Sequence, residues 1–79
     1  MAKSVKVYST QTCPYCHMAK DFLKENNIVF EDIDVSSSQS AAEEMIQKSG
    51  QMGVPVLEID GTVIVGFDRP KIKKALGLQ

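Results

Sequence analysis

The chain of 79 residues has little of several features that would indicate particular functions. It has no tryptophan, one histidine and two cysteines, so side chains that commonly hold a metal ion are scarce. Nine basic and ten acidic residues give a net charge of −1, and no basic stripe indicates a nucleic-acid partner. No apolar run is long enough to span a bilayer. We therefore expect a single small domain over residues 1–79, without metal, nucleic-acid or membrane partners.

The chain also shows no secretory signal pattern at its start, because Met1-Ala2-Lys3 leads directly into a strand pattern. This predicts a cytoplasmic protein. In a reducing compartment, a pair of cysteines is more often catalytic than structural. A monomer is the default expectation for the oligomeric state.

Both cysteines lie in one stretch, Thr12-Cys13-Pro14-Tyr15-Cys16. A Cys-x-x-Cys sequence between a predicted strand and a predicted helix is typical of a redox-active dithiol. Cys13 would lie at the helix N-terminus, where free N–H groups and a partial positive charge stabilise a thiolate. Cys16 would lie one turn further in and more shielded, close enough to attack a mixed disulfide on Cys13. We therefore expect Cys13 to be the nucleophile and Cys16 to resolve the intermediate.

The dithiol has two other interpretations. It could be half of a zinc site, although His17 is the one further nitrogen or sulfur ligand nearby and zinc needs four ligands. The cysteines could also be inert core thiols. His17 itself is predicted to be a solvated helix residue, with tuning of the thiols as the alternative.

Apolar and turn residues predict an alternation of strands and helices. Asp60-Gly61 between two β-rich runs predicts a type I′ hairpin, and Ser40 with Glu43 predicts a capping box that starts the middle helix. The first helix should bury one apolar face, comprising Tyr15, Met18, Ala19, Phe22 and Leu23, and the second should bury Ala41, Met45 and Ile46. Strands are predicted over 4–8, 28–35, 54–59 and 62–65, and helices over 14–26, 40–50 and 68–76.

The order β-α-β-α-β-β-α combines a parallel β-α-β unit with an antiparallel hairpin. It predicts an α/β protein with a four-stranded mixed sheet flanked by three helices, which is a thioredoxin-like architecture.

Three motifs in this order resemble the glutaredoxin family over nearly the whole chain: Cys-Pro-Tyr-Cys at 13–16, Val54-Pro55, and Gly66-Phe67-Asp68. The resemblance implies a thiol–disulfide oxidoreductase of redox homeostasis and electron transport, with no tightly bound cofactor and with glutathione as reducing co-substrate. It implies disulfide-containing or glutathionylated protein partners, ribonucleotide reductase among the compatible ones. Cys13 resembles the family's nucleophile and Cys16 its resolving cysteine.

The resemblance also implies a glutathione groove. Tyr15 resembles a residue that borders it, unless this aromatic ring simply packs over the site. Val54 resembles the residue whose backbone pairs with glutathione, and Pro55 resembles a cis proline opposite the nucleophile. The γ-glutamyl end is expected at Gly66, Phe67 and Asp68, although Asp68 also fits a plain helix N-cap.

Some positions depart from the family pattern. Thr10 stands where many members have lysine, Gly53 where many have threonine, and Arg69 where many have aspartate. Arg69 or Gln11 could still meet a carboxylate of glutathione. The turn at 66–70 resembles that of NrdH-type redoxins, which take electrons from thioredoxin reductase.

The alternatives are therefore an NrdH-like hydrogen donor and an iron–sulfur cluster bridged by two subunits. Pro14 stiffens the loop and argues against the cluster.

Overall fold

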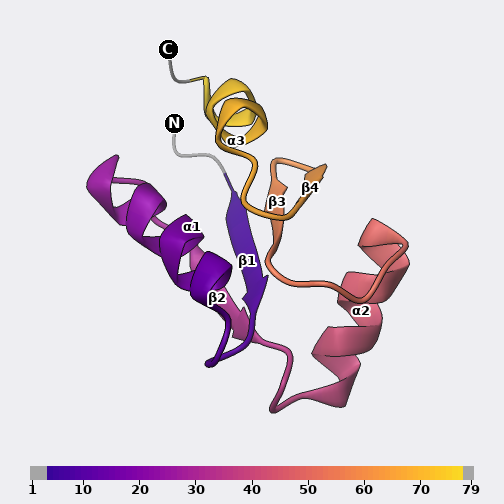
Figure 1. Cartoon of the computed structure of the whole chain (residues 1–79). Coiled ribbons are helices and arrows are strands. Elements are labelled where there is room, and N and C mark those ends of the chain that lie inside the picture. Colours follow the sequence, from indigo (N-terminus) through magenta and orange to yellow (C-terminus); the bar gives the residue numbers. More distant parts are fainter. Residues whose placement is uncertain (1–3, 78–79) are drawn as a thin grey trace.

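The computed structural model describes residues 4–77, and its elements follow the predicted order. Four strands and three helices follow one another in the order β-α-β-α-β-β-α (Figure 1). Their bounds are β1 Val5–Ser9, α1 Pro14–Glu25, β2 Glu31–Asp34, α2 Gln39–Ser49, β3 Val56–Ile59, β4 Thr62–Val65 and α3 Arg69–Leu76. No helix in residues 4–77 is long and apolar enough to cross a membrane.

The sheet has the strand order β2-β1-β3-β4. β1 pairs with β2 in parallel, whereas β1–β3 and β3–β4 are antiparallel. The mixed sheet predicted from the β-α-β unit and the hairpin is confirmed. β1 lies inside the sheet, between β2 and β3. Its C-terminal end leads into the loop before α1, and this loop carries the first cysteine.

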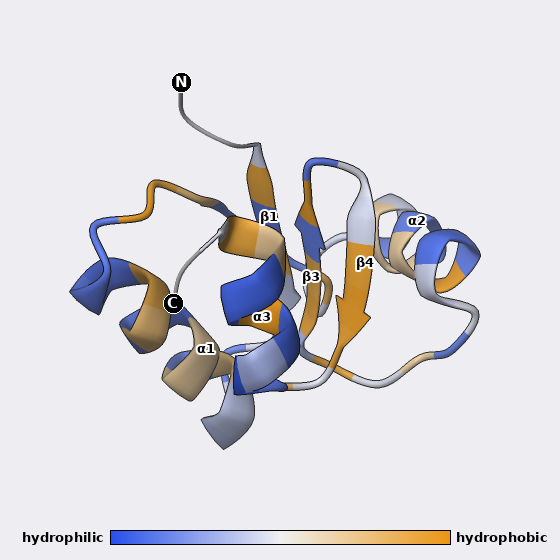
Figure 2. Ribbon diagram, turned by 90° about the horizontal axis from the view of Figure 1, so that it is seen from above, coloured by the Kyte–Doolittle hydropathy of each residue, from blue (hydrophilic) through white to orange (hydrophobic). Residues whose placement is uncertain are grey.

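Two apolar clusters lie on opposite faces of this sheet. α1 and α3 cover one face and α2 covers the other (Figure 2). The larger cluster buries ten apolar side chains, among them Val7, Leu23, Leu57 and Ile72. The smaller one is formed by Tyr8, Met45 and Val56. The alternation of Val7 and Tyr8 between faces follows from the period of two along a strand.

α1 buries a row of side chains that differs in part from the predicted face. Cys16, Ala19 and Leu23 lie against the sheet, spaced three and four residues apart. Tyr15 is 62% exposed and Met18 is 49% exposed, so their assignment to the buried face was wrong. They belong to the neighbouring row of the helix, which ends in Phe22.

That neighbouring row is covered only near Phe22. The ring of Phe67 packs edge-on against Phe22, with 6.0 Å between ring centroids. The loop before α3 thus supplies the cover for Phe22, and Tyr15 and Met18 stay in solvent.

α2 begins earlier than predicted. The N-cap is Ser38, whose hydroxyl accepts a hydrogen bond from the Ala41 N–H at 3.3 Å. The capping box expected from Ser40 is therefore wrong. The chain turns directly after β2, because the Asp34 carboxylate binds the backbone and hydroxyl of Ser36. This turn places the N-cap two residues earlier than predicted.

Only one residue of α2 is fully buried, which is Met45. Ala41 is half-buried and Ile46 is 37% exposed, so the predicted inner face is narrower than expected. The helix covers just the small cluster around Tyr8, and it therefore needs less apolar surface than α1.

Two strands are shorter than predicted. β2 starts at Glu31 because Asn27 takes a positive φ of 58° and the Ile28 N–H bonds back to the last turn of α1. β3 starts at Val56, after a cis peptide bond between Val54 and Pro55.

The β3–β4 hairpin has the predicted turn. Asp60 and Gly61 both take positive φ, at 49° and 88°, as a type I′ turn requires. Asp60 exchanges hydrogen bonds of 2.8 Å with Ser4, through its backbone N–H and its carboxylate. This turn therefore lies at the end of the sheet where β1 begins, opposite to the end where β1 leads into the cysteine loop.

Candidate redox site

Cys13 is the N-cap residue of α1. Its backbone is extended, with φ −96° and ψ 110°, which is the conformation that a capping residue needs. The sulfur accepts a hydrogen bond from the Cys16 N–H, with 3.2 Å between Sγ and N. A free N–H donor and the positive end of the helix dipole are thus directed at the Cys13 sulfur. Cys13 is half-buried, and both cysteines are free thiols.

Cys16 lies one turn into the helix and is fully buried, as predicted from its position. Burial, and next a hydrogen bond with the Cys13 side chain, raise the pKa of Cys16 to about 11. The Thr10 backbone and the charge of Lys20 act in the opposite direction. In the reduced protein, Cys16 is therefore a protonated thiol near neutral pH.

Val54 and Pro55 lie opposite Cys13. The Cys13 thiol donates a weak hydrogen bond to the Val54 carbonyl oxygen, with 3.8 Å between sulfur and oxygen. The Val54-Pro55 bond is cis, as the family resemblance implied. Val54 lies outside the strand ladder, two residues before β3, and it forms the wall that faces the sulfur.

The turn before α3 is tied to that wall. Gly66 has a φ of 82°, a conformation that favours glycine, and its N–H donates to the Pro55 carbonyl at 2.8 Å. Asp68 caps α3 by accepting from the Lys71 N–H at 3.3 Å, so the plain N-cap interpretation is confirmed. The segments 54–55 and 66–68, far apart in sequence, are thereby joined beside the dithiol.

The remaining residues expected around a glutathione groove have different surroundings. Tyr15 is largely exposed at the start of α1. Arg69 places its guanidinium over the Phe22 ring, 5.4 Å from the centroid. Gln11 donates from its side-chain amide to Asp34 at 3.3 Å. The two side chains expected to meet a carboxylate are each held by another side chain.

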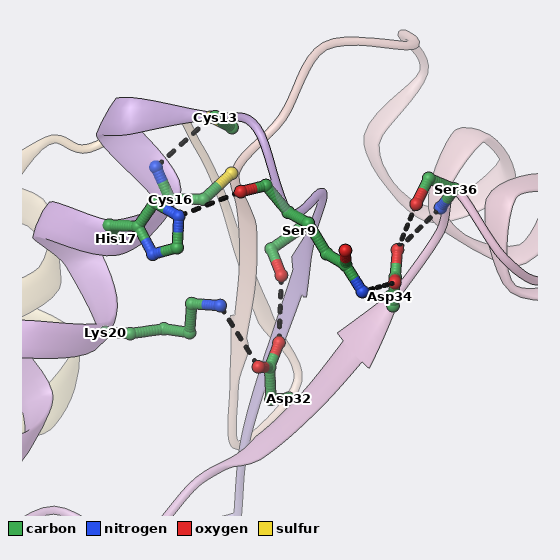
Figure 3. A network of polar contacts seen from close by, with 9 residues as sticks. Ser9, Cys13, Cys16, His17, Lys20, Asp32, Asp34 and Ser36 are labelled. Carbon is green, nitrogen blue, oxygen red and sulfur yellow. Dashed lines mark hydrogen bonds and ion pairs between the residues drawn. The ribbon is translucent and has the colours of Figure 1, made fainter.

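A hollow of about 200 Å³ beside the dithiol was not found from the sequence. A close view shows its polar network (Figure 3). Lys20 forms an ion pair with Asp32 at 3.0 Å, and the Ser9 hydroxyl donates to the same carboxylate at 2.8 Å. The hollow is lined by Ser9, Thr10, Gln11, His17, Lys20, Asp32 and Asp34.

His17 lies at the rim of this hollow, exposed as predicted, with its Nε2 3.0 Å from the Gln11 carbonyl oxygen. The one sequence signal for the hollow is the spacing of His17 and Lys20, which lie three residues apart on one helix and both line it. Among residues 4–77, no group of three or more histidine, cysteine or acidic side chains could hold a metal ion.

A thioredoxin-like fold with a dithiol at the first helix N-terminus defines the class of this protein. A family model described as Glutaredoxin matches residues 5–64. The chain therefore belongs to the glutaredoxin family, and it is a thiol–disulfide oxidoreductase of that family.

Its similarity to individual proteins covers most of the chain. An uncharacterized glutaredoxin-like 8.6 kDa protein in the rubredoxin operon of Clostridium pasteurianum is 47% identical over 72 residues, covering 91% of this chain and 96% of that protein. Glutaredoxin 3 of Escherichia coli K12 is 38% identical over 65 residues, covering 82% and 78%. Among solved structures, the glutaredoxin-like NrdH-redoxin of Escherichia coli, with its thioredoxin-like activity profile, has a TM-score of 0.81 at 25% identity, covering 90% and 92%.

Proposed function

We propose that this protein reduces protein disulfides and glutathione mixed disulfides, with Cys13 as the nucleophile and Cys16 as the resolving thiol. The observation that carries this proposal is the unequal setting of the two sulfurs. Cys13 caps α1 and receives an N–H donor, whereas Cys16 is buried behind it and holds its proton. The more accessible, dipole-facing sulfur attacks first.

The dithiol route then runs in two exchanges. The Cys13 thiolate attacks a substrate disulfide, forms a mixed disulfide and releases the first substrate thiolate. Cys16 loses its proton and attacks the Cys13 sulfur, which releases the second substrate thiolate and leaves a Cys13–Cys16 disulfide. The substrate gains two electrons and the protein loses them. In the monothiol route, Cys13 alone removes glutathione from a glutathionylated protein.

We propose glutathione as the reductant that restores the dithiol. The Val54 backbone lies outside the strand ladder and faces Cys13, where an extended peptide can add as a single-residue strand. The turn Gly66, Phe67 and Asp68 is tied to the same wall through Pro55 and would receive the γ-glutamyl end. Tyr15 would border the groove from its exposed position at the helix start.

A flavoprotein reductase of the thioredoxin reductase type is the second candidate donor. The observation that favours it is the engagement of Arg69 with Phe22 and of Gln11 with Asp34. Neither cation nor amide is then free to meet a glutathione carboxylate without first leaving its partner. The likeness to NrdH-redoxin supports the same candidate.

One assay separates the two donors. The oxidised protein is given either glutathione with glutathione reductase and NADPH, or thioredoxin reductase with NADPH, and NADPH consumption is followed against a protein disulfide. Turnover with glutathione supports the first donor. Turnover with thioredoxin reductase alone would replace it by the second. Activity with neither would contradict both.

We further propose a cytoplasmic monomer that acts on disulfide-containing or glutathionylated proteins, ribonucleotide reductase among the candidates. Two cysteines in a single Cys-x-x-Cys motif fit a catalytic dithiol in a reducing compartment. Sedimentation after anaerobic purification tests the monomer. A dimer carrying a brown chromophore would instead support the iron–sulfur alternative, against which the rigid Pro14 argues.

A further inference from the structure

The hollow beside the dithiol contains a lysine that the proposed mechanism does not use. Lys20 follows Cys16 by four residues, so the two side chains leave α1 on the same row. Lysine side chains on a helix surface normally extend into water, but the Lys20 side chain is only 14% exposed. It lies along the sheet instead, with its ammonium bound to β2.

Two contacts fix this ammonium. Its nitrogen lies 3.0 Å from Asp32 Oδ2, and the other oxygen of Asp32 accepts a hydrogen bond of 2.8 Å from the Ser9 hydroxyl. The carboxylate is thus held by β1 while it holds the lysine. Figure 3 shows the Lys20 ammonium and the Cys16 sulfur on the same side of α1, both turned toward the strands.

The other titratable groups that line this hollow are His17, Asp32 and Asp34, and Cys13 lies beyond Cys16, from whose N–H it accepts a hydrogen bond. Hydrogen bonds from Ser36, first from its side chain, hold the pKa of Asp34 below its usual range. His17 is at the exposed rim, tied to the Gln11 carbonyl. Lys20 is the one lysine or arginine among the residues that line the hollow.

We propose that Lys20 is a positioning residue for the resolving step: its ammonium, fixed by Asp32, stabilises the Cys16 thiolate while that thiolate attacks the mixed disulfide on Cys13. The proposal rests on the dithiol function proposed above. It adds a role to a side chain that touches neither the substrate nor the reacting sulfur of Cys13.

The chemistry of the step explains why a fixed charge is useful there. Before the reaction, the Cys13 sulfur raises the pKa of Cys16 by hydrogen bonding and by its charge. Once Cys13 is in a mixed disulfide, its negative charge is gone, whereas the charge of Lys20 remains. Cys16 then loses its proton to solvent, and its sulfur displaces the substrate thiolate from Cys13. One S–S bond forms as another breaks, so electrons balance.

The test separates the two exchanges in time. The reduced protein is mixed by stopped flow with less than one equivalent of the aromatic disulfide DTNB. A first phase of thionitrobenzoate release reports attack by Cys13, and a second, concentration-independent phase reports resolution by Cys16. We expect Lys20→Gln to slow the second phase roughly threefold to tenfold at neutral pH, because one pKa unit changes the thiolate fraction of Cys16 tenfold. The pH profile of the second phase should shift to higher pH.

Matched variants make the result specific. Lys24→Gln removes the same charge one turn further along α1, where the side chain is exposed, and should leave both phases unchanged. Lys20→Arg keeps the charge and should restore the second phase. Lys20→Met keeps the apolar stem but also removes the charge, so it should slow the second phase as Lys20→Gln does, and circular dichroism checks that both variants fold.

An unchanged second phase in both uncharged variants would overturn the role of Lys20, as would equal slowing by Lys24→Gln or failure of Lys20→Arg to restore it. Equal slowing of the first phase would show a general effect on the dithiol and would also overturn it. If the unaltered protein releases no second thionitrobenzoate, the dithiol function itself fails, which is a distinct result.

Discussion

Two ion-pair clusters lie on opposite faces of the sheet, and each joins a helix to a strand. On the α1 side, Lys20 reaches Asp32 of β2 at 3.0 Å. On the α2 side, Lys48 reaches Glu58 of β3 at 3.0 Å. In each cluster a lysine on a helix meets a carboxylate on a neighbouring strand, yet only the first borders the dithiol.

The second cluster covers a buried aromatic ring. The Lys48 ammonium forms an ion pair with Glu44 at 3.0 Å. It also donates to the Tyr8 hydroxyl at 3.2 Å and lies 5.8 Å from the centroid of the Tyr8 ring. Tyr8 in turn donates to Glu44 at 3.1 Å. The contacts around Lys48 fasten α2 to the sheet, whereas those around Lys20 leave a hollow open beside Cys16. The comparison indicates that the Lys48 cluster contributes to stability and the Lys20 cluster to chemistry.

The largest expected effect on activity comes from replacing the cysteines on the α1 side of the comparison. Cys13→Ser should abolish both the reduction of protein disulfides and the removal of glutathione from a glutathionylated peptide, because it removes the attacking sulfur. Cys16→Ser should abolish the first activity and spare the second. Both are measured by NADPH consumption with the donor that supports turnover. Deglutathionylation by Cys13→Ser would mean that Cys13 is not the nucleophile.

A large effect on stability alone is expected on the α2 face. Met45→Ala should lower the free energy of unfolding by roughly 2–5 kcal/mol, because Met45 is the one fully buried side chain of α2. Urea denaturation measures this, and Ile46→Ala on the same helix is the control, expected below about 1 kcal/mol because Ile46 is partly exposed. The rate of the first DTNB phase should not change. A slower Cys13 would show that the two faces are coupled.

The smallest expected effect is a pH dependence on the same face. Hydrogen bonds from Lys48, and next from Tyr8, lower the pKa of Glu44 in the folded state. A lowered folded pKa contributes stability that is present above the unfolded value of about 4.3 and is lost as pH falls through the folded value. Glu44→Gln should therefore make the acid side of the stability curve shallower. Urea midpoints between pH 7 and pH 3 measure it, and an unchanged slope would assign no net linkage to Glu44.

The fold was predictable because its local signals agree with one another. The Asp60-Gly61 turn and the β-branched runs around it determine the hairpin, and the β-α-β unit determines the parallel pair. The N-cap of α2 was not predictable in this way. Several serines precede that helix, and a turn held by Asp34, not the intrinsic preference of serine, selects Ser38.

The site was predictable only in part. Cys13 and Cys16 lie together in one short motif. Val54 and Pro55, which form the wall opposite Cys13, lie together in another. The pairing of Lys20 with Asp32 depends instead on how α1 lies across the sheet, which no local pattern contains. Tyr15 was assigned to the wrong face because two neighbouring rows of α1 are both apolar, and the sheet packs against only the row of Cys16.

The bonds between Asp60 and Ser4 have a practical consequence. They hold the hairpin tip at the end of the sheet where β1 begins, and β1 then runs its five residues, roughly 17 Å at 3.3 Å per residue, before the chain turns toward Cys13. The molecule thus has a reactive pole and an inert pole. A fluorophore or surface tether attached at the exposed Thr62 would sit at the inert pole and leave the sulfurs unobstructed for incoming partners.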